Sequence, residues 1–299
     1  MMPTDEPLNA ISVDVEDYFQ PEAFARDVPR EDWPSYPSRV VDNTHRILDV
    51  FARHGVRGTF FVLGWVADRF PALVTDIRAA GHELGCHSYW HRPIYSLTPE
   101  EFEADTRRAK AAIEAAAGVS ISCYRAPTFS ITKRSLWALD VLAACGFTSD
   151  SSIYPIYHDN YGIVGSPIRP YAIQCAAAVI DEFPMSTFRA LNYDVPVGGG
   201  GYLRMLPLWF NVYGMRRIIA RGDPAMVYLH PWEVDPDQPR IRTRLKSRLR
   251  HYTNLRGMMR NLEALLQRFR FGTMSETLAQ RAKLIQFRAG ESGTLLPVA

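Results

Sequence analysis

The residues best suited to chemistry in this sequence are two histidines in the stretch HELGCHSYWHRP. His87 and His91 are four residues apart, and Pro93 follows them. Imidazoles at this spacing can point the same way across one helical turn and share a divalent metal ion. Because Pro93 disfavours helical geometry at Arg92, the turn is short and we expect it to belong to a loop. Such spacing also arises by chance, so a metal site needs a third ligand, preferably a carboxylate.

Carboxylates stand in the stretch SVDVED, at the end of another predicted strand. Strand alternation points Asp14 and Glu16 to the same side. Asp17 is the rival third ligand, because the strand can already have turned at that residue. Carboxylates after a strand often only cap the next turn, so this stretch alone leaves both a metal-binding and a structural role open.

The elements that must position these residues alternate along the chain. Hydrophobic periodicity predicts helices over residues 38–55, 71–81, 98–118 and 133–146. Strands are predicted over residues 10–15, 57–64, 82–87, 120–127, 147–152 and 225–229. This alternation predicts βα units and a parallel sheet, with functional residues at the carboxyl ends of the strands.

Titratable side chains follow several of these strands, and together they would form one site. Arg125, Asp150 and His230 each follow a strand of their own, apart from the acidic and histidine stretches. Taken singly, each has a structural alternative: Arg125 as a surface residue, Asp150 in an Asx-turn, and His230 as a core histidine. Their convergence on one sheet edge favours a site.

Five motifs then give the sequence a resemblance to a known family. They are SVDVED, HELGCHSYWH, YRAPTFS, SDSSIYP and VYLHPWE. Their order and spacing resemble those of the polysaccharide deacetylases with a NodB homology domain. The nearest similarity is to the exosortase-associated deacetylases of bacterial exopolysaccharide systems, over roughly residues 11–233. The resemblance implies a distorted (β/α) barrel and the metal-dependent removal of N-acetyl groups from an amino sugar.

The resemblance also implies roles for individual residues. Asp14 matches the general base, and Arg125 matches the arginine that orients this base. His230 matches the general acid, and His87 and His91 match the metal imidazoles. Many members have two adjacent aspartates, whereas here Val15 follows Asp14. Members with a D-x-D pattern place the metal ligand two residues on, which favours Glu16 over Asp17.

The expected cofactor is one divalent metal ion. An imidazole and carboxylate site suits Zn²⁺, and Co²⁺, Ni²⁺ or Mn²⁺ could replace it. The expected partner is an N-acetylated saccharide. We expect Asp150 to support the substrate site, and Trp232 or Tyr193 to stack on a pyranose ring. The four glycines from Gly198 to Gly201 suggest either a mobile lid or a flexible connector.

Bulk properties narrow the class of protein. The 299 residues carry 34 basic and 32 acidic side chains, a net charge of +2 that gives no reason to expect a nucleic-acid partner. No apolar run approaches the ~18 residues of a membrane span. The start MMPTDEPLNA has no apolar core of a signal peptide. The four cysteines lack paired spacing, which indicates reduced thiols. We therefore expect a cytoplasmic protein, peripheral at the inner membrane.

The chain is predicted to have a catalytic barrel over residues 1–235 and an extension over 236–299 packed on the same body. The extension begins with the basic tract 240–250, which holds six Lys or Arg side chains and no acid. Such a run is often a solvated surface. It could also contact an anionic membrane or a lipid-linked pyrophosphate. The period-two pattern predicts an extended segment or a helix with little apolar face.

Two further functions remain open from the sequence. One is an amidohydrolase on the same barrel that acts on a cyclic ureide, a peptide or another non-sugar amide. The other is a non-catalytic carbohydrate-binding relative with a vestigial site. The complete set of Asp14, His87, His91, Arg125 and His230 argues against the second.

Overall fold

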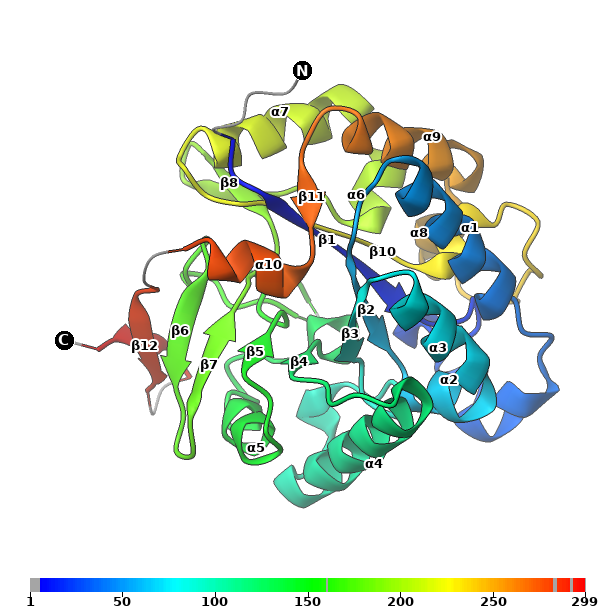
Figure 1. Ribbon diagram of the computed structural model, residues 1–299, viewed down its shortest axis with the longest axis horizontal. Coiled ribbons are helices and arrows are strands. Elements are labelled where there is room, and N and C mark those ends of the chain that lie inside the picture. Colours follow the sequence, from blue (N-terminus) through cyan, green and yellow to red (C-terminus); the bar gives the residue numbers. More distant parts are fainter. Residues whose placement is uncertain (1–5, 160, 282–283, 291–292, 299) are drawn as a thin grey trace.

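The computed structural model describes residues 6–159, 161–281, 284–290 and 293–298. Its centre is an eleven-stranded sheet with helices packed around it (Figure 1). The strand order is β10-β1-β2-β3-β4-β5-β7-β6-β12-β13, and β11 also pairs with β1. Every neighbouring pair from β10 to β7 is parallel, and the pairs β6–β7 and β12–β13 are antiparallel. The prediction of a mixed α/β fold with a parallel sheet is confirmed.

The strands are short, and those at the centre are buried. Their bounds are β1 Asn9–Val15, β2 Thr59–Val62, β3 Glu83–Cys86, β4 Cys123–Tyr124, β5 Ser149–Asp150, β6 Tyr171–Gln174, β7 Val179–Glu182, β10 Met226–Leu229, β11 Phe271–Gly272, β12 Gln286–Ala289 and β13 Leu295–Pro297. A separate hairpin joins β8 Thr187–Ala190 and β9 Tyr193–Pro196. All seven residues of β1 are buried, because it pairs with strands on both sides and is covered on both faces.

Ten α-helices and five short 3-10 turns connect or flank these strands in the described residues. The helices are α1 Val40–Arg53, α2 Gly64–Arg69, α3 Pro71–Ala79, α4 Pro99–Ala117, α5 Ala138–Ala144, α6 Gly200–Met205, α7 Leu208–Ile219, α8 Leu245–Tyr252, α9 Leu255–Leu266 and α10 Met274–Ala279. The 3-10 turns are η1 Glu22–Phe24, η2 Arg30–Ser35, η3 Ile94–Ser96, η4 Pro127–Phe129 and η5 Pro231–Val234. None of the described helices combines the length and apolar character needed to cross a bilayer.

The start and stop signals of the longest helix act as the sequence predicts. Thr98 and Glu101 form a reciprocal capping box before α4, and Gly118 ends the helix with a φ of 66°. Two predicted elements are shorter than expected. Only Cys123–Tyr124 of the predicted strand 120–127 pairs in the sheet, and α5 begins at Ala138 rather than near residue 133.

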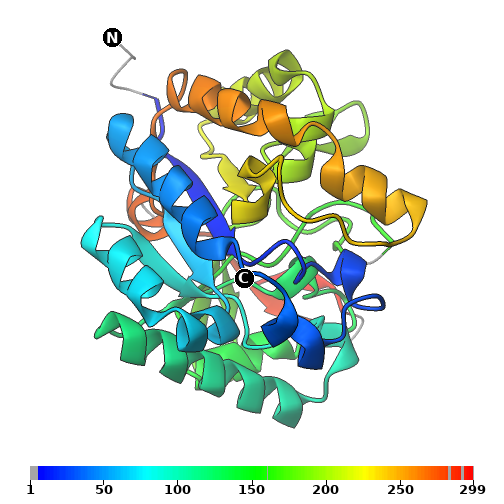
Figure 2. The ribbon, with the colours of Figure 1, turned by 90° about the vertical axis from the view of Figure 1, so that its right-hand side faces the viewer.

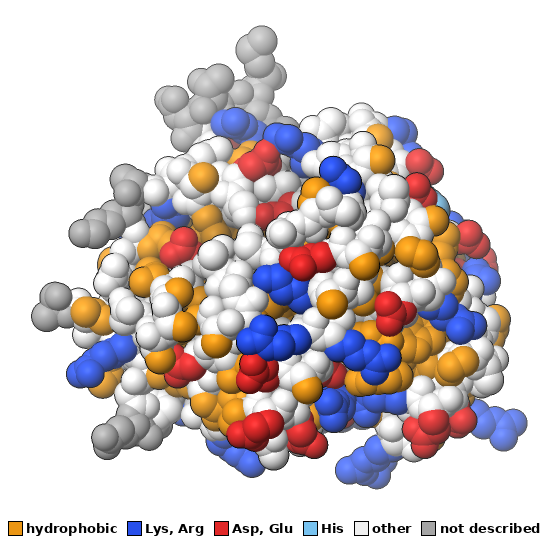
Figure 3. Space-filling model, turned by 60° about the horizontal axis from the view of Figure 1, so that its bottom comes forward, with side chains coloured by type: hydrophobic (Ala, Val, Ile, Leu, Met, Phe, Trp, Pro, Cys, Tyr) orange, Lys and Arg blue, Asp and Glu red, His pale blue; other side chains and the backbone are white. Residues whose placement is uncertain are grey.

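The segment after residue 235 joins the same sheet. Phe271 pairs with Asn9 of β1, and β12 pairs with β6 near the far edge of the sheet. The predicted domain boundary at residue 235 therefore stays a prediction, because described strands from both sides of it pair in the same sheet. All four cysteines are free and buried. Acidic, basic and apolar side chains are interspersed on the face shown in Figure 3.

Candidate metal centre and active site

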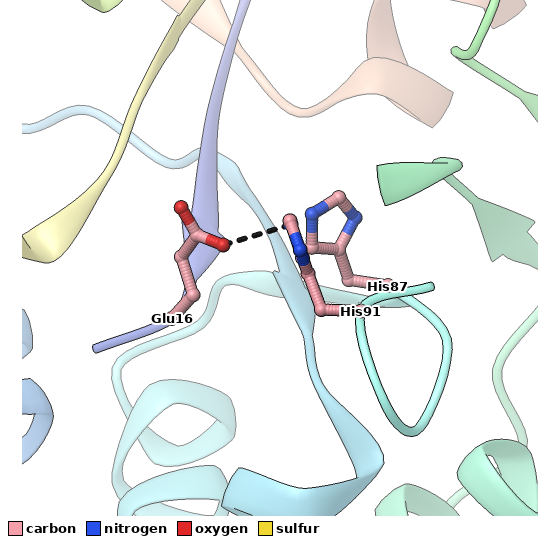
Figure 4. A group of neighbouring side chains, drawn as sticks. All are labelled: Glu16, His87 and His91. Carbon is pink, nitrogen blue, oxygen red and sulfur yellow. Dashed lines mark ion pairs between the residues drawn. The ribbon is translucent and has the colours of Figure 1, made fainter. Parts of the chain in front are cut away.

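Three predicted ligands, Glu16, His87 and His91, meet at the carboxyl ends of β1 and β3. One ligand atom of each lies within 4.8 Å of the others, and all three side chains are buried (Figure 4). Glu16 is the first residue after β1, and His87 is the first after β3. The parallel strands β1 and β3, which lie on either side of β2, therefore bring Glu16 close to two histidines that come more than 70 residues later in the sequence.

His91 reaches this cluster from a tight loop, not from a helical turn. Ser88 and His91 have left-handed φ angles of 63° and 51°. The His91 amide donates to Ser88 Oγ at 3.1 Å, which closes the turn. Arg30 of η2 fixes the loop from outside, donating to the carbonyls of Trp90 at 2.6 Å and His91 at 3.1 Å. The expected loop is present, and its tight turn brings His91 back towards His87, four residues earlier.

The protonation states of the cluster leave lone pairs available for a cation. Nδ1 of His87 donates to the Arg125 carbonyl at 2.8 Å, which leaves Nε2 as the free acceptor. Burial lowers the pKa of His87 to about 4, so its ring is neutral at pH 7. Burial would raise the pKa of Glu16, but the surrounding histidines lower it to about 2. The third ligand therefore carries a negative charge.

Unpartnered polar atoms in the cluster show that a metal ion fits there. Oε2 of Glu16 lies 2.9 Å from Nε2 of His91, yet this oxygen accepts no aligned hydrogen bond. Nδ1 of His91 is also buried without a partner. Buried polar atoms are normally satisfied. Two imidazoles and one carboxylate form a donor set that divalent zinc prefers when it keeps positions open for substrate or water.

The alternative third ligand, Asp17, accepts hydrogen bonds at the start of α1 instead of joining the cluster. Its carboxylate accepts hydrogen bonds from Ser38 Oγ at 2.5 Å and from the Arg39 and Val40 amides at 3.0 and 3.3 Å. These amides belong to the first turn of α1, which otherwise lacks a side-chain cap. Asp17 as a metal ligand is therefore wrong in this geometry, because both its oxygens are occupied by the start of α1.

Asp14 lies beside the cluster and is held by a fully buried arginine. Nη1 of Arg125 donates to Asp14 Oδ1 at 2.7 Å and to Ser12 Oγ at 2.7 Å. Its Nε and Nη2 donate to the Ser151 carbonyl and hydroxyl at 3.1 and 3.0 Å. The guanidinium also lies 4.2 Å from the centroid of the Phe61 ring. Arg125 is therefore no surface residue, and it holds Asp14 in one orientation.

His230 follows β10 and faces Asp14 of β1 and Glu16, which directly follows β1. Its Nε2 lies 3.9 Å from Asp14 Oδ2 and 3.6 Å from Glu16 Oε1. Its Nδ1 lies 3.0 Å from Oε2 of Glu233, so this nitrogen donates to the carboxylate. Burial would lower the pKa of His230, but Glu233, with help from Glu16 and Asp14, raises it to about 9. The ring therefore holds a proton at neutral pH.

Glu233 is itself fixed by a second buried arginine, Arg204 of α6. Nε of Arg204 donates to Glu233 Oε1 at 2.7 Å. Burial would raise the pKa of Glu233, but Arg204 and His230 lower it to about 2. A Cβ atom on Gly200 would lie 1.7 Å from Oε2 of Glu233. The sequence left a mobile lid or a flexible connector open for Gly198 to Gly201, and the structure shows neither, because Gly200 and Gly201 begin α6. The missing side chain of Gly200 makes room for the Glu233 carboxylate.

Trp232 does not form the expected sugar platform. Its ring is 6% exposed and lies between His230, at 5.0 Å between centroids, and His251, at 3.9 Å. Both faces are therefore covered. Its Nε1 donates to Glu16 Oε1 at 3.0 Å. Trp232 thus orients Glu16, a candidate metal ligand, and its buried ring has no free face for a sugar.

The other two predicted substrate residues, Asp150 and Tyr193, differ sharply in exposure. Asp150 is 0% exposed, so it contacts no substrate. It accepts from Ser152 Oγ at 2.6 Å, and Ser152 accepts from the Ala126 amide, next to Arg125. Burial raises the pKa of both Asp150 and its neighbour Glu182. Tyr193 is 74% exposed on the β8–β9 hairpin, and its contact with a sugar stays a prediction.

Sequence reasoning assigned no role to four residues that contact the candidate catalytic side chains or their partners. Ser12 shares the side of β1 with Asp14, and Glu233 is three residues after His230, so their spacing was a usable signal. Ser151 follows Asp150 directly. Arg204 gave no signal, since only the packing of α6 against η5 and α9 brings it to Glu233.

Comparison with known families agrees with this geometry. Residues 31–149 match the family model described as polysaccharide deacetylase. The chain contains a polysaccharide deacetylase domain. Residues 151–279 match a second model, described as a domain of unknown function, DUF3473. The site draws His87, His91 and Arg125 from the first segment and His230 from the second, while Asp14 and Glu16 precede both.

Curated deacetylases are similar over part of this chain. A peptidoglycan-N-acetylglucosamine deacetylase of Bacillus cereus is 32% identical over 98 residues, which are 32% of this chain and 36% of the relative. A chitooligosaccharide deacetylase of Rhizobium leguminosarum bv. trifolii is 33% identical over 100 residues, 33% of this chain and 44% of the relative. The chain spans less than half of the length of these relatives.

A solved structure confirms the fold over nearly the whole chain. The putative polysaccharide deacetylase of Mycobacterium smegmatis superimposes with a TM-score of 0.61 at 20% identity. The superposition covers 94% of this chain and 93% of that chain. At this identity the similarity concerns the fold, and it includes the segment beyond residue 235.

Proposed function

We propose that this protein is a metal-dependent hydrolase that removes N-acetyl groups from an amino sugar. The observation that carries the proposal is the meeting of two proton-transfer groups, Asp14 and His230, at the cluster of Glu16, His87 and His91. Amide hydrolysis needs an activated water, stabilisation of the developing oxyanion, and a proton for the leaving amine. The residues present supply a group for each need.

Glu16, His87 and His91 would hold the metal ion. When bound, a divalent ion of this kind supplies Lewis acidity and lowers the pKa of a water molecule towards ~7. Hydrogen bonds from other residues of the chain would orient these ligands. Trp232 donates to Glu16, and the Arg125 carbonyl accepts from His87. Such partners fix the direction in which the ligand lone pairs point.

Asp14 would act as the general base and His230 as the general acid. Oδ1 of Asp14 is engaged by Arg125, which leaves Oδ2 to accept a proton from water. Nδ1 of His230 is engaged by Glu233, which leaves Nε2 to donate a proton to the departing nitrogen. Two groups with separate partners can thus hold opposite protonation states at one pH.

The proposed substrate is a saccharide of a bacterial exopolysaccharide or its lipid-linked precursor. The deacetylase domain and the resemblance of the motifs DVED and LHPWE support this choice. We place the reaction at the cytoplasmic surface of the inner membrane, where a lipid-linked precursor would be available. The basic tract 240–250 would favour this location. An amidohydrolase acting on a non-sugar amide is the alternative that the same side chains allow.

The test is an acetate-release assay on chelated and metal-reloaded protein. The substrates are N-acetylglucosamine oligosaccharides and, as the non-sugar alternative, allantoin and an acetylated peptide. We expect acetate and free amine from the oligosaccharides only, abolished by chelation and restored by Zn²⁺, Co²⁺, Ni²⁺ or Mn²⁺. Ring opening of allantoin without release of acetate from sugars would overturn the proposal. Saccharide binding without turnover at any metal would leave the non-catalytic alternative.

A further inference from the structure

Helix α8 exposes two leucines on a helix that is otherwise polar. Leu245 is 66% exposed and Leu249 is 58% exposed. Residues four apart lie on the same face of a helix, so the two side chains form one apolar stripe directed at solvent. The opposite side of α8 carries His251, which is buried against Trp232. The stripe therefore lies on the side of the helix that turns away from the protein.

Cations flank this stripe on both sides. At 100° per residue, Lys246 and Arg248 fall to either side of the two leucines, and both are exposed. Arg242 and Arg244 precede the helix and are also exposed. The tract 240–250 holds no acidic residue. Its one ion pair with the described residues joins Lys246 Nζ and Asp159 at 4.0 Å. Most of this positive charge is therefore uncompensated.

The helix is a fixed part of the surface. Arg204 donates to the carbonyls of Arg250, His251 and Thr253 at 3.0, 3.1 and 2.6 Å. These bonds satisfy carbonyl groups that the end of a helix leaves without partners. The same guanidinium binds Glu233, the partner of His230. Figure 2 shows α8, in gold, at the edge of the face that also displays η5, in yellow. Arg204 thus joins the end of the helix that carries the stripe to Glu233, the partner of His230.

We infer that α8 docks the protein on an anionic lipid bilayer, with Leu245 and Leu249 in the headgroup region and the flanking cations on lipid phosphates. Leucines on one face between lysine and arginine side chains are typical of interfacial helices. A polyanionic saccharide would pair with the cations but would leave the aliphatic stripe in water. The inference deepens the proposed function by naming its membrane surface. Vesicle binding itself requires no turnover.

The test is co-sedimentation of the full chain with phosphatidylcholine vesicles that contain or lack phosphatidylglycerol, at low and at physiological salt. The first variant carries Arg242→Gln, Arg244→Gln, Lys246→Gln and Arg248→Gln. The second carries Leu245→Ser and Leu249→Ser. Each cation near an anionic surface contributes roughly fivefold to partitioning, so the first variant should lose at least roughly tenfold at low salt. The second should lose roughly tenfold with a weaker dependence on salt.

Matched controls come from α7, which lies elsewhere on the molecule (Figure 1) and has exposed residues of both kinds. Trp209 is 68% exposed, and Arg216 and Arg217 are exposed in its last turns. Trp209→Gln, or Arg216→Gln with Arg217→Gln, should bind vesicles like the wild type. Binding that depends on Trp209 but not on the α8 residues would overturn the inference. So would retention of the wild type on alginate beads with no partitioning to either vesicle.

Activity on a soluble N-acetylglucosamine oligosaccharide separates this inference from the proposed function. Both α8 variants should deacetylate it at the wild-type rate. Normal turnover with unchanged vesicle binding in both variants would reject the docking surface alone. Absent turnover in the wild type, together with binding that depends on α8, would reject the proposed activity alone.

Discussion

The indole Nε1 of Trp232 donates a hydrogen bond of 3.0 Å to Oε1 of Glu16, a member of the candidate metal cluster. Trp232 sits just after β10 and Glu16 just after β1, so pairing of these two strands makes the contact. The Trp232 ring, which was expected to stack on a sugar, thus orients the candidate metal ligand Glu16. The distinction can be tested directly.

Trp232→Phe should weaken metal binding while keeping an aromatic ring between His230 and His251. Loss of a hydrogen bond to a metal ligand typically costs roughly 10–100-fold in affinity. The measurement is a competition titration with a chromophoric zinc chelator. A sugar platform predicts the opposite pattern, in which Phe preserves metal affinity and KM is the parameter that responds.

Glu16→Ala and Asp17→Ala should separate metal binding from helix capping. Glu16→Ala, like His87→Ala or His91→Ala, should fall below one metal per chain, measured by mass spectrometry of desalted protein. Asp17→Ala should keep its metal. It should lose about 1–2 kcal/mol of stability, because the start of α1 loses its cap. A stable Asp17→Ala protein without metal would reverse the assignment.

Asp14→Asn and His230→Ala should retain metal and lose turnover. Each removes a proton-transfer group, which is worth roughly 10²- to 10⁴-fold in rate. Metal content and kcat for acetate release are measured on the same preparations. Our division of roles would be wrong if either variant lost its metal. Near-normal rates in either would remove that residue from the mechanism.

Gly200→Ala and Gly201→Ala form a matched pair in the first turn of α6. A Cβ on Gly200 would meet the Glu233 carboxylate at 1.7 Å, so Glu233 must move and its bonds to Arg204 and His230 must weaken. We expect about 1–3 kcal/mol of destabilisation and reduced kcat. On Gly201 the nearest atom is Met205 Cε at 3.7 Å. Gly201→Ala should be neutral or stabilising by about 0.5–1 kcal/mol. Thermal melts and acetate release report both effects.

Stability should fall in acid partly through His82, outside the metal site. Burial lowers the pKa of His82 to about 4 from the ordinary 6.5, and its Nδ1 accepts from the Gly58 amide at 3.1 Å. Between pH 6.5 and pH 4 His82 is protonated in the unfolded chain but neutral in the folded chain. The free energy of unfolding therefore decreases as the pH falls through this range. His82→Gln keeps an acceptor and adds no proton. Its Tm should drop less than that of the wild type between pH 7 and pH 5.

The sequence predicted what depends on local pattern, and it missed what depends on packing between distant segments. Alternation along β1 correctly placed Asp14 and Glu16 on one side. The strand ends brought together the predicted residues Asp14, His87, His91, Arg125 and His230. The role of Asp17 depended on whether α1 begins within its reach, about 20 residues later. Trp232 was expected to stack on a sugar because its ring is large and aromatic, but His251 from α8 stacks on one face of this ring. No periodicity reports such a contact.

The position of β1 between β2 and β10 has a consequence for synthesis of the chain. β1 pairs with β2 about 45 residues later but with β10 more than 200 residues later. All three proposed metal ligands lie within the first 91 residues, whereas His230 is translated roughly 7–28 s after His91 at typical elongation rates. During that interval one edge of β1 has no partner strand. A nascent chain on the ribosome would thus acquire the proposed metal ligands before it acquires the proposed proton donor, His230.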